Sequence, residues 1–172
     1  MKDAILKETN KIKGLQLRAA GRASNLFWLG FGEMIPVTRR GEIEEVPEVA
    51  LHIQCAWRVS TTSKILVASQ DFYSPRSDWE EGVQDFDWDV SRSNRFDEQI
   101  TAFLEVAAEK SVIAEVEVDS LGGLKILMSE SYVLEVFPDS SNESEDWEFW
   151  RLFNRRKDSP HFVVSGNGVE YI

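Results

Sequence analysis

The segment Leu51–Ser60, LHIQCAWRVS, decides the expected fold because its apolar and polar side chains alternate without interruption. Such a period of two is typical of a β-strand that buries one face and leaves the other wetter. The apolar set consists of Leu51, Ile53, Cys55, Trp57 and Val59. We therefore predict one continuous strand over this segment, with which later strands can pair.

Short polar connections separate further strand-like segments on both sides of this one. Amphipathic helices are predicted over 2–13, where Gly14 ends the helix, and over 94–110, where Asn94 caps it. Strands are predicted over 15–22, 26–32, 51–60, 64–70, 112–119, 124–128, 132–137, 146–154 and 161–165, and a loop over 33–48. Short connections between strands favour antiparallel pairing. The expected fold is α+β, a single domain over 1–172 with a mainly antiparallel sheet of about eight or nine strands.

The composition indicates a globular protein in a reducing compartment. Apolar residues make up 42% of the 172 residues, and Cys55 is the single cysteine, so no internal disulfide can form. The first thirteen residues are charged throughout and lack the apolar core of a signal peptide. No apolar run is long enough to span a bilayer. A cytoplasmic location without membrane association is therefore expected.

The net charge narrows the class of partner. The formal charge is −11, although residues 1–24 are net basic, so the acidic excess lies in the remainder of the chain. Nucleic-acid binding depends on basic patches, which such a surface does not favour. Acidic surfaces attract basic proteins and accelerate their encounter. A basic protein partner is expected and a nucleic-acid partner is not.

The least regular stretch, 71–93, interleaves aromatic residues with acids. Disordered segments are poor in aromatic residues, so this segment is expected to pack partly against the sheet. Tryptophan within a polar rim is typical of a protein-binding surface. The predicted partner-binding residues are Trp79, Glu80, Glu81, Asp85, Asp87, Trp88 and Asp89.

Signatures of catalysis and of cofactor binding are missing from the sequence. There is no G-x-S-x-G elbow, no G-x-G-x-x-G loop and no Walker loop. The run Asp85-x-Asp87-x-Asp89 resembles the start of a calcium loop, but Val90 and Phe96 occupy the positions that require glycine and an acid. No catalytic residue, metal site or cofactor is therefore predicted.

Two polar sets in strand-like segments admit other interpretations. His52, Gln54 and Arg58 share the polar face of the first segment, where they would line a pocket if the protein were a small-ligand binder or an enzyme. Arg151 alternates with aromatic residues, and we expect its guanidinium to need an acidic partner or an aromatic face. His52 and His161 are expected to be mainly structural.

A resemblance to other proteins covers about residues 50–165 and rests on three segments, LHIQCAWR, EDWEFWRLF and HFVVSG. The chain resembles small bacterial proteins of uncharacterised families, which have toxin-immunity proteins among their relatives. The resemblance implies a soluble intracellular domain that neutralises a toxin by binding it, and it implies no catalytic residues.

Three hypotheses follow from the sequence. The leading one is a non-enzymatic intracellular binding protein, of the immunity type, that neutralises a basic toxin domain. The second is a small-ligand binder or enzyme with its pocket at His52, Gln54 and Arg58. The third is a homo-oligomeric structural protein. The sequence does not determine the oligomeric state.

Overall fold

The protein is described here by a computed structural model that covers residues 1–80, 82, 85–144, 147–156 and 160–172. Two α-helices lie within this part of the chain, α1 (Lys2–Thr9) and α2 (Arg95–Ala107). Three short 3-10 helices accompany them, η1 (Asn10–Ile12), η2 (Ser69–Tyr73) and η3 (Ser129–Ser131). No helix among these residues is long and apolar enough to cross a membrane.

The strands of the described residues form two antiparallel sheets. They are β1 (Leu17–Ala23), β2 (Leu26–Arg39), β3 (Glu42–Ile53), β4 (Ala56–Ser60), β5 (Ile65–Ala68), β6 (Ile113–Val118), β7 (Leu124–Met128), β8 (Val133–Phe137), β9 (Glu148–Asn154), β10 (Phe162–Ser165) and β11 (Gly168–Tyr171). One sheet has six strands in the order β1-β2-β3-β9-β10-β11, and the other has five in the order β5-β4-β8-β7-β6. The α+β class is confirmed, but eleven strands in two sheets replace the predicted eight or nine in one.

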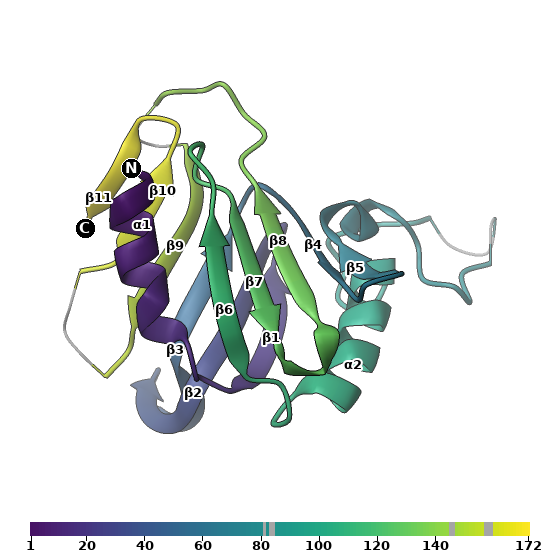
Figure 1. Cartoon of the computed structure of the whole chain (residues 1–172). Helices are drawn as coiled ribbons and strands as arrows, with labels where there is room; N and C mark the ends of the chain where they lie inside the picture. Colours follow the sequence, from purple (N-terminus) through teal and green to yellow (C-terminus); the bar gives the residue numbers. More distant parts are fainter. Residues whose placement is uncertain (81, 83–84, 145–146, 157–159) are drawn as a thin grey trace.

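The two sheets pack face to face around one apolar core (Figure 1). The six-stranded sheet contributes Phe27, Leu51 and Trp150, all at most 1% exposed. The Trp150 indole Nε1–H also donates to the Gly122 carbonyl, in the turn between β6 and β7, at 2.8 Å. In Figure 1, α1 and α2 lie at opposite sides of this sandwich.

The prediction of one continuous strand over Leu51–Ser60 is wrong. The segment ends β3 at Ile53, turns at Gln54 and Cys55, and begins β4 in the other sheet at Ala56. Alternation persists across this corner because the inner faces of both strands contact the same core. The alternation therefore predicted correctly which side chains are buried, but it did not show that the segment belongs to two different sheets.

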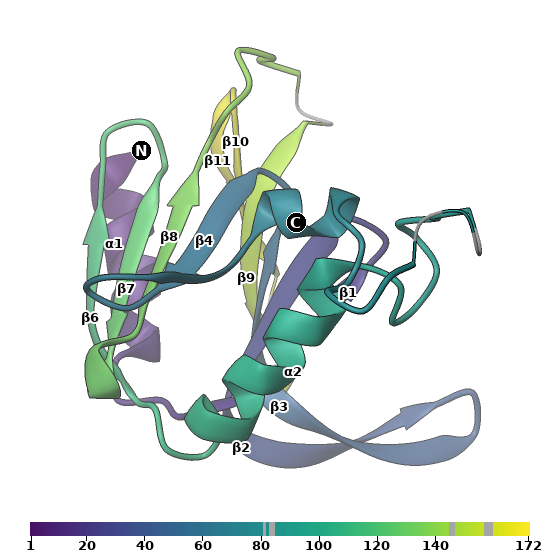
Figure 2. The ribbon, with the colours of Figure 1, turned by 90° about the vertical axis from the view of Figure 1, so that its right-hand side faces the viewer.

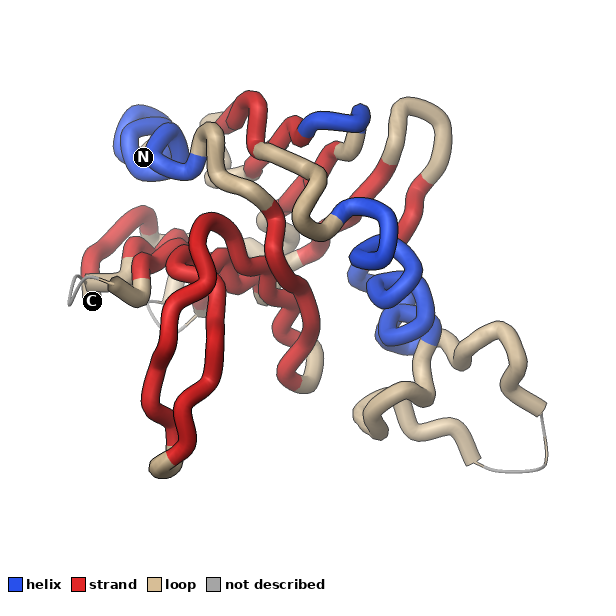
Figure 3. The backbone as a smooth tube through the Cα atoms, turned by 90° about the horizontal axis from the view of Figure 1, so that it is seen from below, coloured by secondary structure: helices blue, strands red, loops and turns tan. Residues whose placement is uncertain are grey.

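The predicted loop over 33–48 is also wrong, because it forms the outer half of the hairpin between β2 and β3. Figures 2 and 3 show it projecting from the body as a two-stranded arm, which we call the hairpin arm. Arg40 and Gly41 at its tip have φ values of 50° and 85°, as a two-residue hairpin turn with positive φ at both central positions requires. Pro36 is compatible with β2 here because β1 pairs with β2 only as far as Phe31.

The helix predictions are confirmed with small shifts at their ends. The helix expected over 2–13 is α1 followed by η1, and the helix expected over 94–110 is α2. The Asn94 side chain caps α2 by accepting from the Asp97 backbone N–H at 2.9 Å. The short strand β11 lies beyond the last predicted strand and was not expected.

Candidate functional site

The predicted acidic aromatic segment emerges from η2 and returns to α2 beside the end of β1 (Figure 2). We call residues 74–93 the acidic loop. Among the predicted residues, Glu80, Asp85, Asp87 and Asp89 are exposed, and Trp79 and Trp88 are half-buried. Glu81 lies outside the described residues. The structure thus brings the described members of the set onto one loop.

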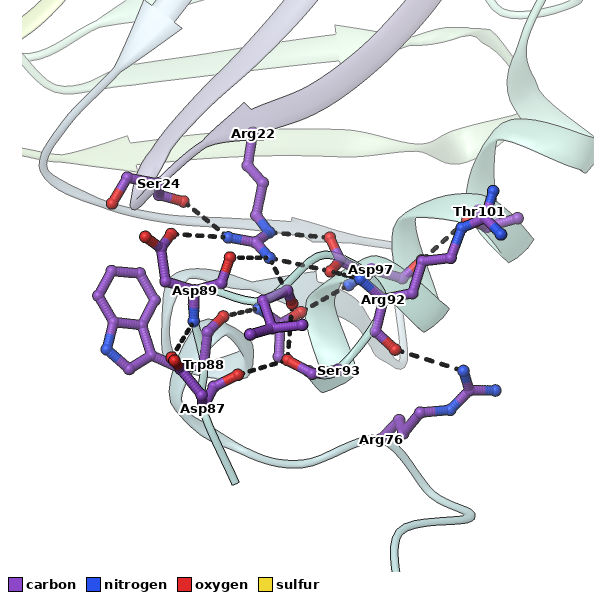
Figure 4. Close-up of polar contacts among 12 residues, drawn as sticks. Arg22, Ser24, Arg76, Asp87, Trp88, Asp89, Arg92, Ser93, Asp97 and Thr101 are labelled. Atoms are coloured by element: carbon purple, nitrogen blue, oxygen red, sulfur yellow. Dashed lines mark hydrogen bonds and ion pairs between the residues drawn. The ribbon is translucent and has the colours of Figure 1, made fainter. Parts of the chain in front are cut away.

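Arg22 of β1 holds the end of the acidic loop against α2. The side chains of Arg22 and Asp97 are 9% and 16% exposed. Arg22 Nε donates to Asp97 Oδ1 at 2.9 Å and Nη2 donates to Asp97 Oδ2 at 3.1 Å, the paired geometry that suits a guanidinium (Figure 4). Nη2 also donates to the Val90 carbonyl at 3.1 Å, and Nη1 contacts Asp89 Oδ1 at 3.4 Å. The hydrogen bond with Asp97 raises the pKa of Arg22, so this anchor stays charged.

Polar side chains at the start of α2 make a second set of anchoring contacts. Asn94 Nδ2 donates to the Trp88 carbonyl at 2.8 Å, and Ser93 Oγ donates to the Asp87 carbonyl at 2.6 Å. The backbone N–H of Arg92, a residue with φ of 66°, donates to Asp97 Oδ2 at 2.7 Å. These bonds pair three backbone groups of the loop, those of Asp87, Trp88 and Arg92, with side chains.

Aromatic side chains pair within the loop and at its root. Tyr73 and Trp88 meet edge to face with ring centroids 5.3 Å apart, and Trp79 and Phe86 do so at 5.7 Å. A pocket of about 220 Å³ lies within the loop, with Trp79, Asp85 and Asp87 among its lining residues. The loop therefore presents partly exposed aromatic surface among carboxylates, the composition of an interface anchor.

The other predicted set, His52, Gln54 and Arg58, does not share a surface. His52 lies on the outer face of the six-stranded sheet, and Gln54 lies in the turn that leaves that sheet. Arg58 lies on the outer face of the five-stranded sheet, where its Nε donates to Glu135 Oε2 at 2.6 Å. Its guanidinium also lies over the Phe137 ring at 5.2 Å. The structure thus separates His52 and Arg58 onto opposite sides of the sandwich.

His52 and His161 instead contact the Phe153 ring, and Arg151 Nη1 lies 3.3 Å from His161 Nδ1. The Phe153 ring stacks on His161 at 4.1 Å between centroids and meets the edge of His52 at 4.9 Å. Arg151 Nε donates to Glu148 Oε1 at 2.8 Å, which confirms the expected acidic partner. Burial, with the charges of Arg155 and Arg151, lowers the pKa of His52 to about 4. These side chains come from β3, from β9 and from the residue before β10, so their contacts link the three segments on the outer face of the sheet.

The lowered pKa of His52 predicts a pH-dependent stability. A histidine in the unfolded chain has a pKa of about 6.5, so the unfolded state binds more protons as the pH falls. The contribution of His52 should be fully present above about pH 6.5 and be lost as the pH falls toward about 4. In urea unfolding, His52→Gln should lose less stability than wild type between about pH 7.5 and about pH 5. An NMR titration midpoint of His52 near 6.5 would contradict this.

The described residues contain no group of three or more His, Cys, Asp or Glu side chains arranged to hold a metal ion. Asp87 Oδ1 accepts from the Asp89 backbone N–H at 3.0 Å, so part of the D-x-D-x-D run serves the loop's own conformation. Cys55 is buried between the sheets, and burial raises the pKa of its thiol to about 12.

No protein-family model, no curated protein and no solved structure matches this chain. Its function is therefore inferred from the geometry of the site.

Proposed function

We propose that the chain is a non-enzymatic binding protein whose acidic loop captures a basic protein partner. One observation carries the proposal: the largely buried pair of Arg22 and Asp97 holds the end of the acidic loop, while Asp85, Asp87 and Asp89 stay exposed. A segment whose end is already held in place loses less conformational entropy when it binds. Such an arrangement favours recognition over a purely solubilising role for the acids.

Charge and aromatic surface would act at different stages of binding. Exposed carboxylates on Asp85, Asp87 and Asp89 would steer a basic partner toward the loop. Trp79 and Trp88 would then lose their remaining exposed surface in the complex. The mechanism is electrostatic steering followed by aromatic anchoring.

The proposed partner class is a basic toxin domain in the cytoplasm. The net charge of −11 and the exposed acids of the loop support a basic partner. The single cysteine supports a reducing compartment. Neutralisation would then require only that the loop cover the toxin's basic surface.

Two matched double variants test the role of the loop. Glu80→Gln with Asp85→Asn removes two exposed loop charges, and Glu105→Gln with Glu115→Gln removes two exposed charges on α2 and β6. A partner co-purified from the native host should associate about three- to tenfold more slowly with the loop variant. Its association with the control variant should be nearly unchanged.

The salt dependence of these rates completes the test. Association of the wild-type chain should slow as the ionic strength rises, and that of the loop variant should slow less. Biosensor kinetics with the purified partner, repeated at several salt concentrations, measure how steeply each association rate falls. Equal rates for the two double variants would show that only the overall charge matters, and the loop would lose its assigned role.

A further inference from the structure

A second candidate site lies where η1 packs beside the middle of β3, the end of β9 and the start of β10. Figure 1 shows these elements on the other side of the sandwich from the acidic loop. The site is a pocket of about 370 Å³. Its apolar wall is formed by Ile12, Leu15, Val49, Leu152 and Phe162. Pockets of this volume, with an apolar wall and a few polar groups, are typical of small-molecule sites.

The two acids at the rim, Glu8 and Glu48, are each paired with a cationic side chain. Glu8 Oε1 accepts from the Tyr171 hydroxyl at 2.9 Å and Oε2 accepts from Lys11 Nζ at 2.6 Å. Glu48 Oε1 accepts from the Glu33 backbone N–H at 3.1 Å, and Oε2 accepts from Arg156 Nε at 2.6 Å. Lys11 and Arg156 already balance the charges of Glu8 and Glu48, so a cationic ligand would gain little from either carboxylate.

Two donors at the rim, Lys11 and Asn154, retain hydrogens for a ligand. The Lys11 side chain is 63% exposed, and Glu8 takes only one of its three ammonium hydrogens. Asn154 Oδ1 accepts from the Arg156 backbone N–H at 2.8 Å, so the NH₂ group of the same amide remains a donor. The mouth of the pocket therefore offers two donors to a ligand, the charged ammonium of Lys11 and the amide of Asn154.

We propose that this pocket binds a small carboxylic acid with an apolar tail. The tail would occupy the space between Leu15, Val49 and Leu152, and the carboxylate would lie at the mouth beside Lys11 and Asn154. Burial of the tail supplies most of the affinity, and the charged hydrogen bond to Lys11 selects the head group. This site is independent of the acidic loop, so either assignment can fail alone.

Calorimetric titration of the full chain with octanoate, octan-1-ol and octylamine tests the tail and the head group separately. Octanoate should bind saturably at one site per chain, and the alcohol and the amine should bind about tenfold more weakly. Lys11→Met should weaken octanoate binding about tenfold and leave octanol binding unchanged. Lys13→Met is the matched control, because Lys13 is exposed in the same segment but does not line the pocket.

Leu15→Trp fills the pocket and should abolish octanoate binding while the far-UV circular dichroism stays native. Should that variant misfold, methyl NMR of the wild-type chain locates the ligand, because Leu15, Val49 and Leu152 should shift together on titration. Absence of saturable octanoate binding would overturn the proposal. Octanoate binding that survives Leu15→Trp in a folded chain would overturn the location, and octylamine binding as tightly as octanoate would overturn the head-group assignment.

Discussion

Replacing Arg22 with methionine should lower the free energy of unfolding by about 2–3 kcal/mol and release the acidic loop. The substitution leaves the Asp97 carboxylate, which is 16% exposed, without its guanidinium partner. Loss of one member of a fully buried pair costs about 3–5 kcal/mol, and partial access of water to Asp97 reduces this figure. Urea unfolding measures the stability, and hydrogen exchange of the amides of Val90, Ser93 and Asp97 measures the release.

Arg58→Met provides the matched control for this substitution. Arg58 also donates to a carboxylate, that of Glu135, but its side chain is far more exposed than that of Arg22. The cost should therefore stay below about 1 kcal/mol, with no change in exchange in the loop. If the two substitutions destabilise the chain equally, Arg22 is an ordinary surface arginine. If Arg22→Met leaves partner affinity intact, a fixed loop is not needed for binding.

Trp57→Ala should have the largest effect on stability, a loss of about 3–5 kcal/mol. Trp57 of β4 is 2% exposed and stacks on Phe27 of β2 with ring centroids 3.8 Å apart. It also meets Phe72 of η2 and Phe96 of α2 edge to face. The four rings join the two sheets, α2 and the root of the acidic loop, so their loss should loosen all of these together.

Trp147→Ala tests whether this effect belongs to the position or to tryptophan in general. Trp147 is 50% exposed just before β9, and its replacement should change the free energy of unfolding by less than about 0.5 kcal/mol. Chemical unfolding of both variants, followed by far-UV circular dichroism, gives the comparison. Similar losses for the two variants would show that the four-ring cluster is not the link between the sheets.

The helices could be predicted because their caps and apolar spacing are visible within a few neighbouring residues. The cap of α2 is read from Asn94 and the residues that follow it, and its buried face is read from spacing alone. The corner at Gln54 and Cys55 could not be read in this way. Alternation depends only on which side chains contact the core, and here both sheets share one core.

The prediction for the hairpin arm failed in the opposite sense, because strands were taken for a loop. A strand outside the core needs no apolar alternation, so the glutamates and prolines of 33–48 gave the signal of a loop. Backbone pairing between β2 and β3 continues there nonetheless, as far as Arg39 and Glu42. Only the turn at Arg40 and Gly41 carries a local signal, the glycine that suits a positive φ.

Part of the candidate site could be proposed from the sequence. Composition identified the acidic aromatic loop, because aromatic residues among acids are unusual in disordered segments. The anchor was missed because Arg22 and Asp97 are 75 residues apart, and a single sequence gives no signal for such a pair. The separation of His52 from Arg58 has the same origin as the corner, since both were placed on one strand.

The order of the strands also has a consequence for synthesis on the ribosome. In the six-stranded sheet, β3 is flanked by β2 and by β9, and all of the other sheet lies between β3 and β9 in the chain. Until residues 148–154 emerge, the edge of β3 from Val49 to Ile53 lacks the partner with which it pairs in the finished fold. An unpaired, apolar strand edge invites pairing with other chains. We therefore expect the nascent chain to be most vulnerable to aggregation late in translation. At that stage the strands of the five-stranded sheet have emerged, but β9 has not yet paired with β3.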